Sequence, residues 1–334
     1  MSITVLRPGL LTTIQDAGRY GYQKYGVIAS GAMDLYGLRL ANILVGNPET
    51  EAVLEITLAG PALQFNDDRL IAITGGDLSP EVNGFAVPLW RPVYLKKGSV
   101  LRFGACKSGC RAYLAVAGGY HIDNVMGSKS TYLRAGIGGF NGRALQASDH
   151  LALNPPGEQS DRFIQHLGRR PGGAAFTAAE WYASHSYIRE VLPAATVRVV
   201  RGEQFELFDA GSVEQFLQGV FQVSTQSDRM GYRLNGPSMR LKEAAEMISE
   251  AVSLGTIQVP PDGNPIILLA DRQTAGGYPK IAQVVSGDVD KLAQVKPGGK
   301  IRFKEITLEE AERLYMEKEL MIGNLHTAVR LKLS

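Results

Sequence analysis

The sequence lacks the features that define several large classes of protein. It has no run of 18 or more apolar residues, so no segment is expected to cross a bilayer as a helix. Its first nine residues have neither the apolar core nor the cleavage site of a signal peptide. Lys and Arg (35) nearly balance Asp and Glu (33), and this gives no electrostatic attraction for nucleic acid or an anionic membrane. We therefore expect a cytoplasmic protein that binds neither.

Cysteine and histidine are too few and too scattered for most metal sites. The two cysteines, Cys106 and Cys110, have no pair of histidines nearby to complete a four-ligand zinc site. The five histidines are spread along the chain, which argues against non-haem iron as well. A disulfide is not expected in the cytoplasm. We interpret both cysteines as small apolar residues in or beside a strand, and we predict no metal site in this chain.

Two signatures of nucleotide and ester chemistry are also missing. The sequence contains no G-x-x-x-x-G-K-[ST] loop for nucleotide phosphates and no G-x-S-x-G nucleophile turn. Glycine, by contrast, is abundant, with 38 residues in 334. Because glycine serves tight turns, this number favours many short elements joined by turns.

Several short stretches occur twice, in the same order. Residues 96–103 resemble residues 296–303, and Lys, Gly, Arg and Phe recur 200 positions apart. Residues 51–53 and Pro61 recur 199 positions later, and the Gly-Tyr pair at 21–22 recurs 210 positions later. This period is too long for a solenoid repeat. It indicates two whole domains that descend from one.

The repeated segments have the character of short strands. Residues 93–95 and 100–103 flank a glycine turn and predict a hairpin, while residues 70–74 and 266–270 are apolar runs that end in turn residues. Such frequent short strands are typical of closed or nearly closed barrels. The fold class predicted is therefore mainly β, with two tandem β-barrel domains.

Helices are expected to be few and short. Residues 34–45 have one apolar face, and capping boxes begin helices at Ser212 and Thr307. We expect the helix over 307–321 to cover a barrel. The predicted domains are a first barrel with an extra Gly-rich segment (1–155), a connecting region with some order of its own (156–195) and a second barrel with the C-terminal helix (196–334).

The first of three polar, glycine-rich segments covers residues 12–22. It combines Asp16 and Arg19 with flexible backbone. A guanidinium matches planar oxyanions, so Arg19 is a candidate to bind a substrate carboxylate or phosphate. The alternative is an internal Asp16–Arg19 pair that ties the turn.

The second segment, residues 127–139, combines hydroxyl groups, Lys129, Arg134 and four glycines. Exposed backbone N–H groups together with Lys129 would suit an anion. The alternative is an ordinary loop with solvated cations.

The third segment, residues 271–279, directly follows an apolar strand, and residues 228–233 are candidates to join it. A polar cluster at a strand end is a common place for a binding site. The alternative is that Asp–Arg pairs hold two turns.

These segments also carry a family resemblance that covers nearly the whole chain. The motifs are Thr-Thr-Ile-Gln-Asp-x-Gly-Arg (12–19), Gly-Tyr-Gln (21–23), Ser-Gly-Ala-Met-Asp (30–34), Ser-Thr-Tyr-Leu-Arg-Ala-Gly (130–136), Ser-Asp-Arg-Met-Gly-Tyr-Arg-Leu (227–234) and Ala-Asp-Arg-Gln-Thr-Ala-Gly-Gly-Tyr-Pro (270–279). As a set they resemble the C-subunit family of bacterial 5-oxoprolinase. That family is also called the KipI antagonist, allophanate hydrolase subunit 2 or biotin-dependent carboxyltransferase domain. Residues 118–124 depart from the more apolar, Pro-containing stretch expected there, which affects one loop.

The resemblance implies a fold, an activity and partners. The fold would be two tandem cyclophilin-like β-barrels. The partners would be the KipI-like B subunit and the A subunit of 5-oxoprolinase, and the complex would open 5-oxo-L-proline to L-glutamate with ATP as co-substrate. The chain would then be part of a hydrolase of a cyclic amide that is active only with its partners. Whether this chain itself binds ATP stays open.

The chemistry suggests roles for the polar residues. A lactam carbonyl is a poor electrophile, so its activation calls for cations and N–H donors around the developing charge. The candidate catalytic residues are Asp16, Lys129, Asp228 and Asp271. The candidate substrate-binding residues are Arg19, Arg134, Arg229, Arg272, Gln273 and Tyr278. These roles are a hypothesis, which the resemblance does not fix for individual residues.

Two other functions stay open. The chain could be the carboxyltransferase subunit of a urea carboxylase-like enzyme, with biotin supplied by another chain because no biotinyl-lysine motif is visible here. It could also be a non-enzymatic antagonist that sequesters a KipI-like kinase inhibitor.

Overall fold

The computed structural model describes residues 1–168, 176–184, 194–243 and 247–332. The chain divides into two compact units. Unit 1 comprises Met1–Arg19, Asp34–Ile188 and Met321–Ser334, and unit 2 comprises Tyr20–Met33 and Arg189–Leu320. Tyr20–Met33 thus belongs with unit 2 although it lies early in the chain. The predicted domain boundaries, 1–155, 156–195 and 196–334, stay a prediction.

Unit 1 is built from two six-stranded sheets. The first has the order β11 (His150–Ala152), β1 (Ser2–Arg7), β4 (Ala62–Phe65), β9 (Val100–Arg102), β6 (Glu81–Val82) and β7 (Phe85–Ala86). The second has the order β12 (Phe176–Ala178), β8 (Pro92–Leu95), β5 (Arg69–Asp77), β10 (Ser108–Val116), β3 (Val53–Thr57) and β2 (Leu11–Gln15). Both sheets contribute to one core, in which Val5 and Leu63 meet Ile73 and Leu114.

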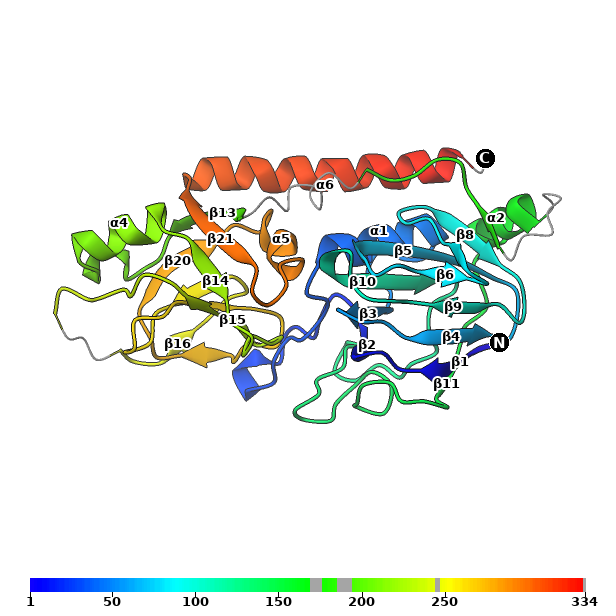
Figure 1. Cartoon of the computed structure of the whole chain (residues 1–334), viewed down its shortest axis with the longest axis horizontal. Helices are drawn as coiled ribbons and strands as arrows, with labels where there is room; N and C mark the ends of the chain where they lie inside the picture. Colours follow the sequence, from blue (N-terminus) through cyan, green and yellow to red (C-terminus); the bar gives the residue numbers. More distant parts are fainter. Residues whose placement is uncertain (169–175, 185–193, 244–246, 333–334) are drawn as a thin grey trace. The chain divides into compact units, whose positions relative to one another are not determined.

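Among the described residues, the helices α1 (Leu35–Val45) and α2 (Glu158–Gly168) lie within unit 1. The helix α1 lies against β5 and β10 (Figure 1). It begins where the Asp34 carboxylate accepts a hydrogen bond from Gly37 N, and it ends at Gly46, whose φ of 77° suits glycine. The helix α2 and the strand β12 lie in the predicted connecting region, which confirms that this region is partly ordered.

Unit 2 is a closed barrel with the strand order β13 (Ala195–Arg201), β20 (Lys280–Val284), β17 (Thr256–Gln258), β18 (Ile266–Leu268), β15 (Gly231–Asn235), β14 (Phe221–Val223) and β21 (Lys300–Glu305). The parallel pair β13–β21 closes it. A separate ribbon pairs β16 (Glu250–Ala251) with β19 (Ala275–Gly276). The described residues of unit 2 also form η1 (Gln23–Tyr25), η2 (Phe205–Leu207), α4 (Ala210–Gln218), α5 (Val289–Ala293) and the first part of α6 (Leu308–Leu331). From Met321 onward, α6 belongs to unit 1. In the core of unit 2, the Phe216 and Phe303 rings stack with centroids 4.4 Å apart.

The mainly β, tandem fold predicted from the sequence is confirmed. The prediction of only short helices is wrong for α6, which has 24 residues and extends beyond the predicted end at 321. No proline interrupts 308–331, so nothing in the backbone forces an earlier end. Among the described residues, no helix is both long and apolar enough to span a membrane. A cytoplasmic location stays a prediction.

The strongest sequence repeat occupies matching places in the two units. Gly98 precedes β9 with a φ of 84°, and Gly298 precedes β21 with a φ of 82°. The N–H of Gly98 donates to Phe65 O (2.7 Å), and that of Gly298 donates to Val223 O (2.8 Å). Both strands lead to buried phenylalanines, Phe103 and Phe303. The Gly-Tyr repeat is different, because its first copy lies in a loop and its second copy in β15.

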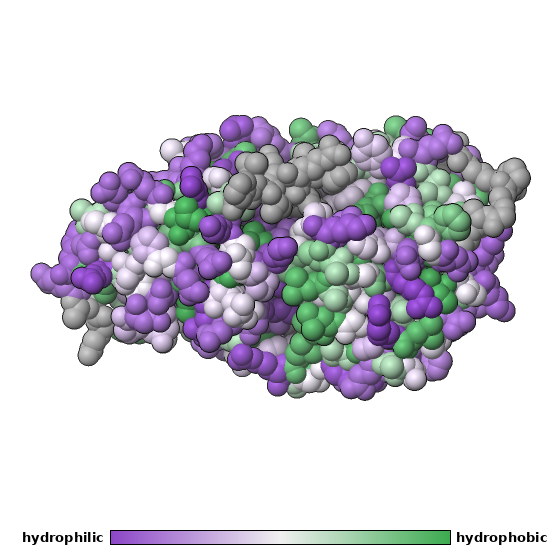
Figure 2. Space-filling model, in the orientation of Figure 1, coloured by the Kyte–Doolittle hydropathy of each residue, from purple (hydrophilic) through white to green (hydrophobic). Residues whose placement is uncertain are grey.

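The surface visible in Figure 2 is mixed. Hydrophilic residues are spread widely and are interrupted by smaller hydrophobic areas.

Candidate functional site

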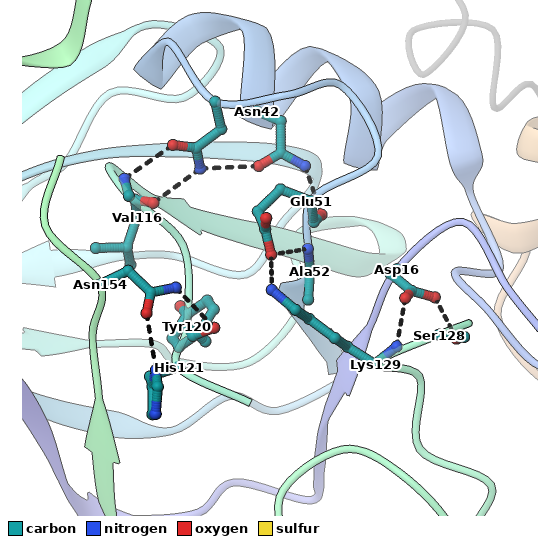
Figure 3. Close-up of polar contacts among 12 residues, drawn as sticks. Asp16, Asn42, Glu51, Ala52, Val116, Tyr120, His121, Ser128, Lys129 and Asn154 are labelled. Atoms are coloured by element: carbon teal, nitrogen blue, oxygen red, sulfur yellow. Dashed lines mark hydrogen bonds and ion pairs between the residues drawn. The ribbon is translucent and has the colours of Figure 1, made fainter. Parts of the chain in front are cut away.

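The Asp16 carboxylate organises a loop of unit 1. Asp16 follows β2 and is only 8% exposed. Its Oδ1 accepts hydrogen bonds from Gly18 N (2.8 Å), Ser128 Oγ (2.7 Å) and Ser130 Oγ (2.5 Å). Its Oδ2 accepts one from Lys129 N (2.5 Å), as Figure 3 shows. Because both oxygens are occupied, Asp16 in this arrangement acts as the anchor of residues 128–130.

The Lys129 side chain points to a carboxylate that the sequence analysis had not proposed for the site. Its Nζ lies 2.6 Å from Glu51 Oε1, and both side chains are about one-fifth exposed (Figure 3). The same Oε1 accepts a hydrogen bond from Ala52 N (3.0 Å). A Cβ at Gly119 would come within 2.8 Å of Glu51 Cγ, so only glycine leaves room for this carboxylate. Glu51 had stood out in the sequence only as part of a repeat.

Arg19 holds the same loop through hydrogen bonds to two of its carbonyl groups. It is fully buried, and it donates from Nε to Val125 O (2.9 Å) and from Nη2 to Ser130 O (2.9 Å). A Cβ at Gly138 would lie 2.7 Å from Arg19 Nη2, so the Gly-rich segment packs directly on the guanidinium. These contacts describe a loop anchor. A substrate-binding role for Arg19 stays a prediction.

The N–H groups of the Gly-rich segment are largely used within unit 1. Those of residues 128–132, 136, 137 and 139 donate to acceptors in the loop or to neighbouring residues. An anion that reached this loop would therefore meet cationic side chains rather than a ring of N–H groups. The cations are Lys129, paired with Glu51, and the exposed Arg134.

In unit 2, Arg229 and Asp271 form a buried ion pair. The distances are 2.9 Å from Arg229 Nε to Asp271 Oδ2 and 3.1 Å from Nη2 to Oδ1, and the side chains are 6% and 8% exposed. Arg229 Nη2 also donates to Gly31 O (2.6 Å). The pair thereby fastens the Tyr20–Met33 segment to the barrel. An Asp–Arg pair that holds two turns was the alternative to a binding site in this segment. A direct role of Arg229 or Asp271 in binding or catalysis stays a prediction.

Asp228, next in the chain to Arg229, is exposed. Its Oδ1 accepts a hydrogen bond from Met230 N (2.8 Å), an Asx turn that shapes the approach to β15. The two neighbours thus differ, since one is buried in an ion pair and the other faces solvent.

Arg272, Gln273 and Tyr278 lie along one loop of unit 2. Arg272 is half-buried, and its guanidinium makes two long contacts of 3.4 Å, to Val252 O and Leu269 O. Burial lowers the pKa of Arg272 from its ordinary value, and the nearby Tyr20 acts in the opposite direction. Gln273 and Tyr278 are exposed. This loop therefore presents a partly desolvated cation beside accessible polar groups.

A second ion pair supports that loop. Lys280 Nζ lies 2.5 Å from Glu250 Oε2, which joins β20 to the β16–β19 ribbon. The hydrogen bond to Glu250 raises the pKa of Lys280. A Cβ at Gly276 in β19 would lie 2.3 Å from Gln258 Nε2, so a larger residue there would displace the Gln258 amide. Neither Lys280 nor Gln258 had been proposed from the sequence.

Unit 1 also contains a buried polar group that the sequence did not reveal. The hydroxyl of Tyr113 donates to Glu55 Oε2 (2.9 Å) and accepts from Asp34 N (2.8 Å). Burial, together with the nearby Glu55, raises the pKa of Tyr113 well above its usual value. No motif pointed to this contact, because its members are far apart in the sequence.

The ten proposed site residues thus fall into two sets. In unit 1, Asp16, Arg19 and Lys129 meet in one hydrogen-bonded loop, and Arg134 lies further along the same loop. In unit 2, Asp228, Arg229, Asp271, Arg272, Gln273 and Tyr278 occupy two neighbouring loops. Within the described ranges, no group of three or more His, Cys, Asp and Glu residues could hold a metal ion.

Comparison with known proteins assigns the chain to a family. Residues 25–305 match the carboxyltransferase domain, subdomain A and B. The chain belongs to this carboxyltransferase domain family. The family assignment confirms the resemblance found from the motifs.

Two curated members of the carboxyltransferase domain family match along nearly their whole length. The C subunit of 5-oxoprolinase from Haemophilus influenzae is 36% identical over 317 residues, which cover 95% of each chain. The protein of the same name from Escherichia coli is 35% identical over the same share of each chain.

In other family members the domain is part of a much longer chain. The Kluyveromyces lactis urea amidolyase structure is 32% identical with a TM-score of 0.84, and the match covers 97% of this chain and 20% of that one. The urea carboxylase structure from the same yeast is 32% identical with a TM-score of 0.85, covering 97% and 29%.

Proposed function

We propose that this chain is the C subunit of an ATP-dependent 5-oxoprolinase, which opens 5-oxo-L-proline to L-glutamate together with the A and B subunits. The observation that carries the proposal is the identity of 35–36% to two proteins named as the C subunit of 5-oxoprolinase, over 95% of both chains. The word subunit in those names implies further chains. We infer that one is the KipI-like B subunit and another is the A subunit, in a cytoplasmic hetero-oligomer.

Two cations, one in each unit, support amide chemistry on a small acid, each through its own surroundings. Arg272 is a partly desolvated guanidinium that suits the substrate carboxylate. Lys129, fixed through its main chain by Asp16 and through its side chain by Glu51, is a cation suited to stabilise negative charge that develops during the reaction. In this proposal Asp16 and Arg19 position the loop of Lys129. The Arg229–Asp271 pair positions the residues that lead to Arg272.

Each unit also offers exposed candidate residues. Gln273, Tyr278 and Arg134 are side chains that a substrate could reach, and Asp228 is an exposed carboxylate able to accept a proton. We assign ATP to the complex as co-substrate, since this chain has no Walker-type loop.

A second candidate function has its own support. The TM-scores of 0.84 and 0.85 to urea amidolyase and urea carboxylase structures favour a carboxyltransferase that acts on urea with biotin supplied by another chain. Both candidates require a site that recognises an amide carbonyl.

Reconstitution tests the proposal. This chain and its two purified partner subunits are mixed with 5-oxoproline and ATP, and the glutamate and ADP formed are measured. Each of the three protein chains is then omitted in turn. We expect glutamate only when all three are present. Failure of the full mixture to form glutamate would refute the first function, and carboxylation of urea with a biotin-bearing partner would establish the second.

A pair of lysine variants tests the site within that assay. Lys129→Met removes the cation near Glu51 and should lower kcat by about 100-fold, the scale for losing one preorganised group that stabilises developing charge. Lys107→Met is the matched control, because Lys107 is exposed in the same unit. Equal activity of the two variants would remove Lys129 from the proposed mechanism.

A further inference from the structure

Ser30 has a backbone conformation that serine rarely adopts. Its φ is +54°, in the left-handed region, and Gly31 follows with a φ of +94°. A glycine would fit both positions without strain, yet the first is a serine. Such strain persists only where the surroundings enforce it, and it gathers at functional sites.

The Ser30 hydroxyl carries a second cost. The residue is 5% exposed, and among the residues that the structure describes its Oγ has no hydrogen-bond partner. A buried hydroxyl without a partner is unfavourable, because it has lost its bonds to water without replacing them. Ser30 therefore carries two independent costs, a strained backbone and a buried hydroxyl without a partner. It lies in the Ser-Gly-Ala-Met-Asp motif and is not among the site residues proposed above.

The surroundings in unit 2 hold Ser30 in place. Ala29 and Met33 are buried on either side, and Gly31 O accepts the hydrogen bond from Arg229 Nη2. The backbone around Ser30 is thus constrained by buried neighbours and by the Arg229 hydrogen bond to the next carbonyl.

The charges around Ser30 indicate what kind of group it binds. The charge of Arg229 is matched by Asp271, so this pair offers no net charge for an anion. A hydroxyl whose neighbouring residue, Gly31, contacts a neutralised pair suits a neutral acceptor such as a carbonyl oxygen. The carboxylate of a substrate has a better partner in Arg272, which directly follows Asp271 in the chain.

We propose that Ser30 Oγ donates a hydrogen bond to the amide carbonyl oxygen of the substrate. This inference rests on the proposed function, and it names the carbonyl of a lactam or urea as the group bound. The strained turn keeps the hydroxyl at this place and withholds it from partners within the chain. Ser30 is then a substrate-binding residue, and Arg229 and Asp271 are positioning residues that hold its segment.

Two substitutions separate the hydroxyl from the strain. Ser30→Ala removes the hydroxyl and keeps a side chain at positive φ, while Ser30→Gly removes both. If the hydroxyl binds substrate, both variants lower kcat/KM of the three-subunit complex by about tenfold, the scale of one neutral hydrogen bond. Ser30→Gly should also unfold at a higher temperature than Ser30→Ala, because glycine relieves the strain.

Ser148 provides a matched control. It is also a serine at positive φ (70°), and it is exposed in unit 1. Ser148→Gly should likewise be more thermostable than Ser148→Ala, and both should keep kcat/KM within about twofold of the wild type.

Calorimetry keeps this test separate from that of the proposed function. Binding of 5-oxoproline and of urea is measured for the wild-type complex and for Ser30→Gly. If the complex binds one amide without turning it over, the proposed function fails, while weaker binding by Ser30→Gly still supports the role of Ser30. Wild-type kcat/KM or wild-type affinity in Ser30→Gly would overturn the role, as would the absence of binding of either amide to the wild type.

Discussion

The Arg229–Asp271 pair allows one prediction to be developed in detail. Asp271→Asn keeps the shape of the side chain but leaves the Arg229 guanidinium buried without its counter-charge. Loss of one partner of a buried pair costs about 3–5 kcal/mol. Because Arg229 also holds Gly31 O, the Tyr20–Met33 segment should loosen from the barrel before the rest of unit 2.

A double variant separates the pair from its surroundings. In Arg229→Met/Asp271→Leu both charges are gone, so the largest penalty disappears. The Gly31 carbonyl, however, loses its donor, which costs about 1–3 kcal/mol if it stays buried. The double variant should therefore be more stable than Asp271→Asn and less stable than the wild type.

Guanidinium unfolding followed by far-UV circular dichroism measures these differences, and hydrogen exchange of peptides from residues 20–33 localises them. The control is Glu158→Gln, which removes an exposed pair with Arg162 and should leave both measurements unchanged. The reasoning is refuted if Asp271→Asn behaves like this control, or if the double variant is less stable than the single one.

Two further predictions concern the fold. Gly98→Ala and Gly298→Ala should each destabilise the chain by about 1–2 kcal/mol, because both glycines have positive φ. The added Cβ meets no other atom within 4 Å in either turn, so backbone strain is the whole expected cost. Chemical unfolding measures both variants, and a clear difference between them would argue against equivalent turns. Asp288 is fully buried, and burial raises its pKa. Hydrogen bonds from Arg198, together with the charges of Lys291 and Arg198, outweigh burial and hold the pKa below its ordinary value. The unfolded chain therefore binds the proton more readily, so this stability is present above pH about 4 and is lost as the pH falls through the folded pKa. Asp288→Asn should flatten the fall of the unfolding midpoint with acid, and an unchanged slope would contradict the assignment.

Much of the fold could be predicted because its signals are local. The turns at Gly98 and Gly298 are recognisable from a glycine that follows a lysine and precedes a strand. The hairpin predicted over 93–103 is wrong, because β8 pairs with β5 and β12 while β9 pairs with β4 and β6 in the other sheet. A turn signal is local, but the partner that a strand takes is decided by distant residues. The length of α6 differs from the prediction because Gly323 and Asn324, residue types that often end a helix, follow the predicted end at 321. The helix nevertheless continues through them to Leu331, and Ile322 and Val329 are buried beyond that point. Local patterns also could not show that Tyr20–Met33 groups with the second unit.

The candidate site was predictable only in part. Motifs found the loops, but which charge pairs with which is decided by contacts between distant residues. Asp16 anchors Ser128 and Ser130 more than 100 positions away, and Lys129 pairs with Glu51. Asp271 and Arg229 form an ion pair with each other, and two residues 42 positions apart give no local signal of that contact.

The most direct test of the account compares two reactions of the same chain. Reconstituted with the A and B subunits of 5-oxoprolinase, it is assayed for glutamate from 5-oxoproline and ATP; with a biotin carboxylase and a biotin carrier, it is assayed for carboxylation of urea. The account predicts glutamate formation that depends on this chain, with the urea reaction at background. Turnover of urea without any formation of glutamate would contradict it.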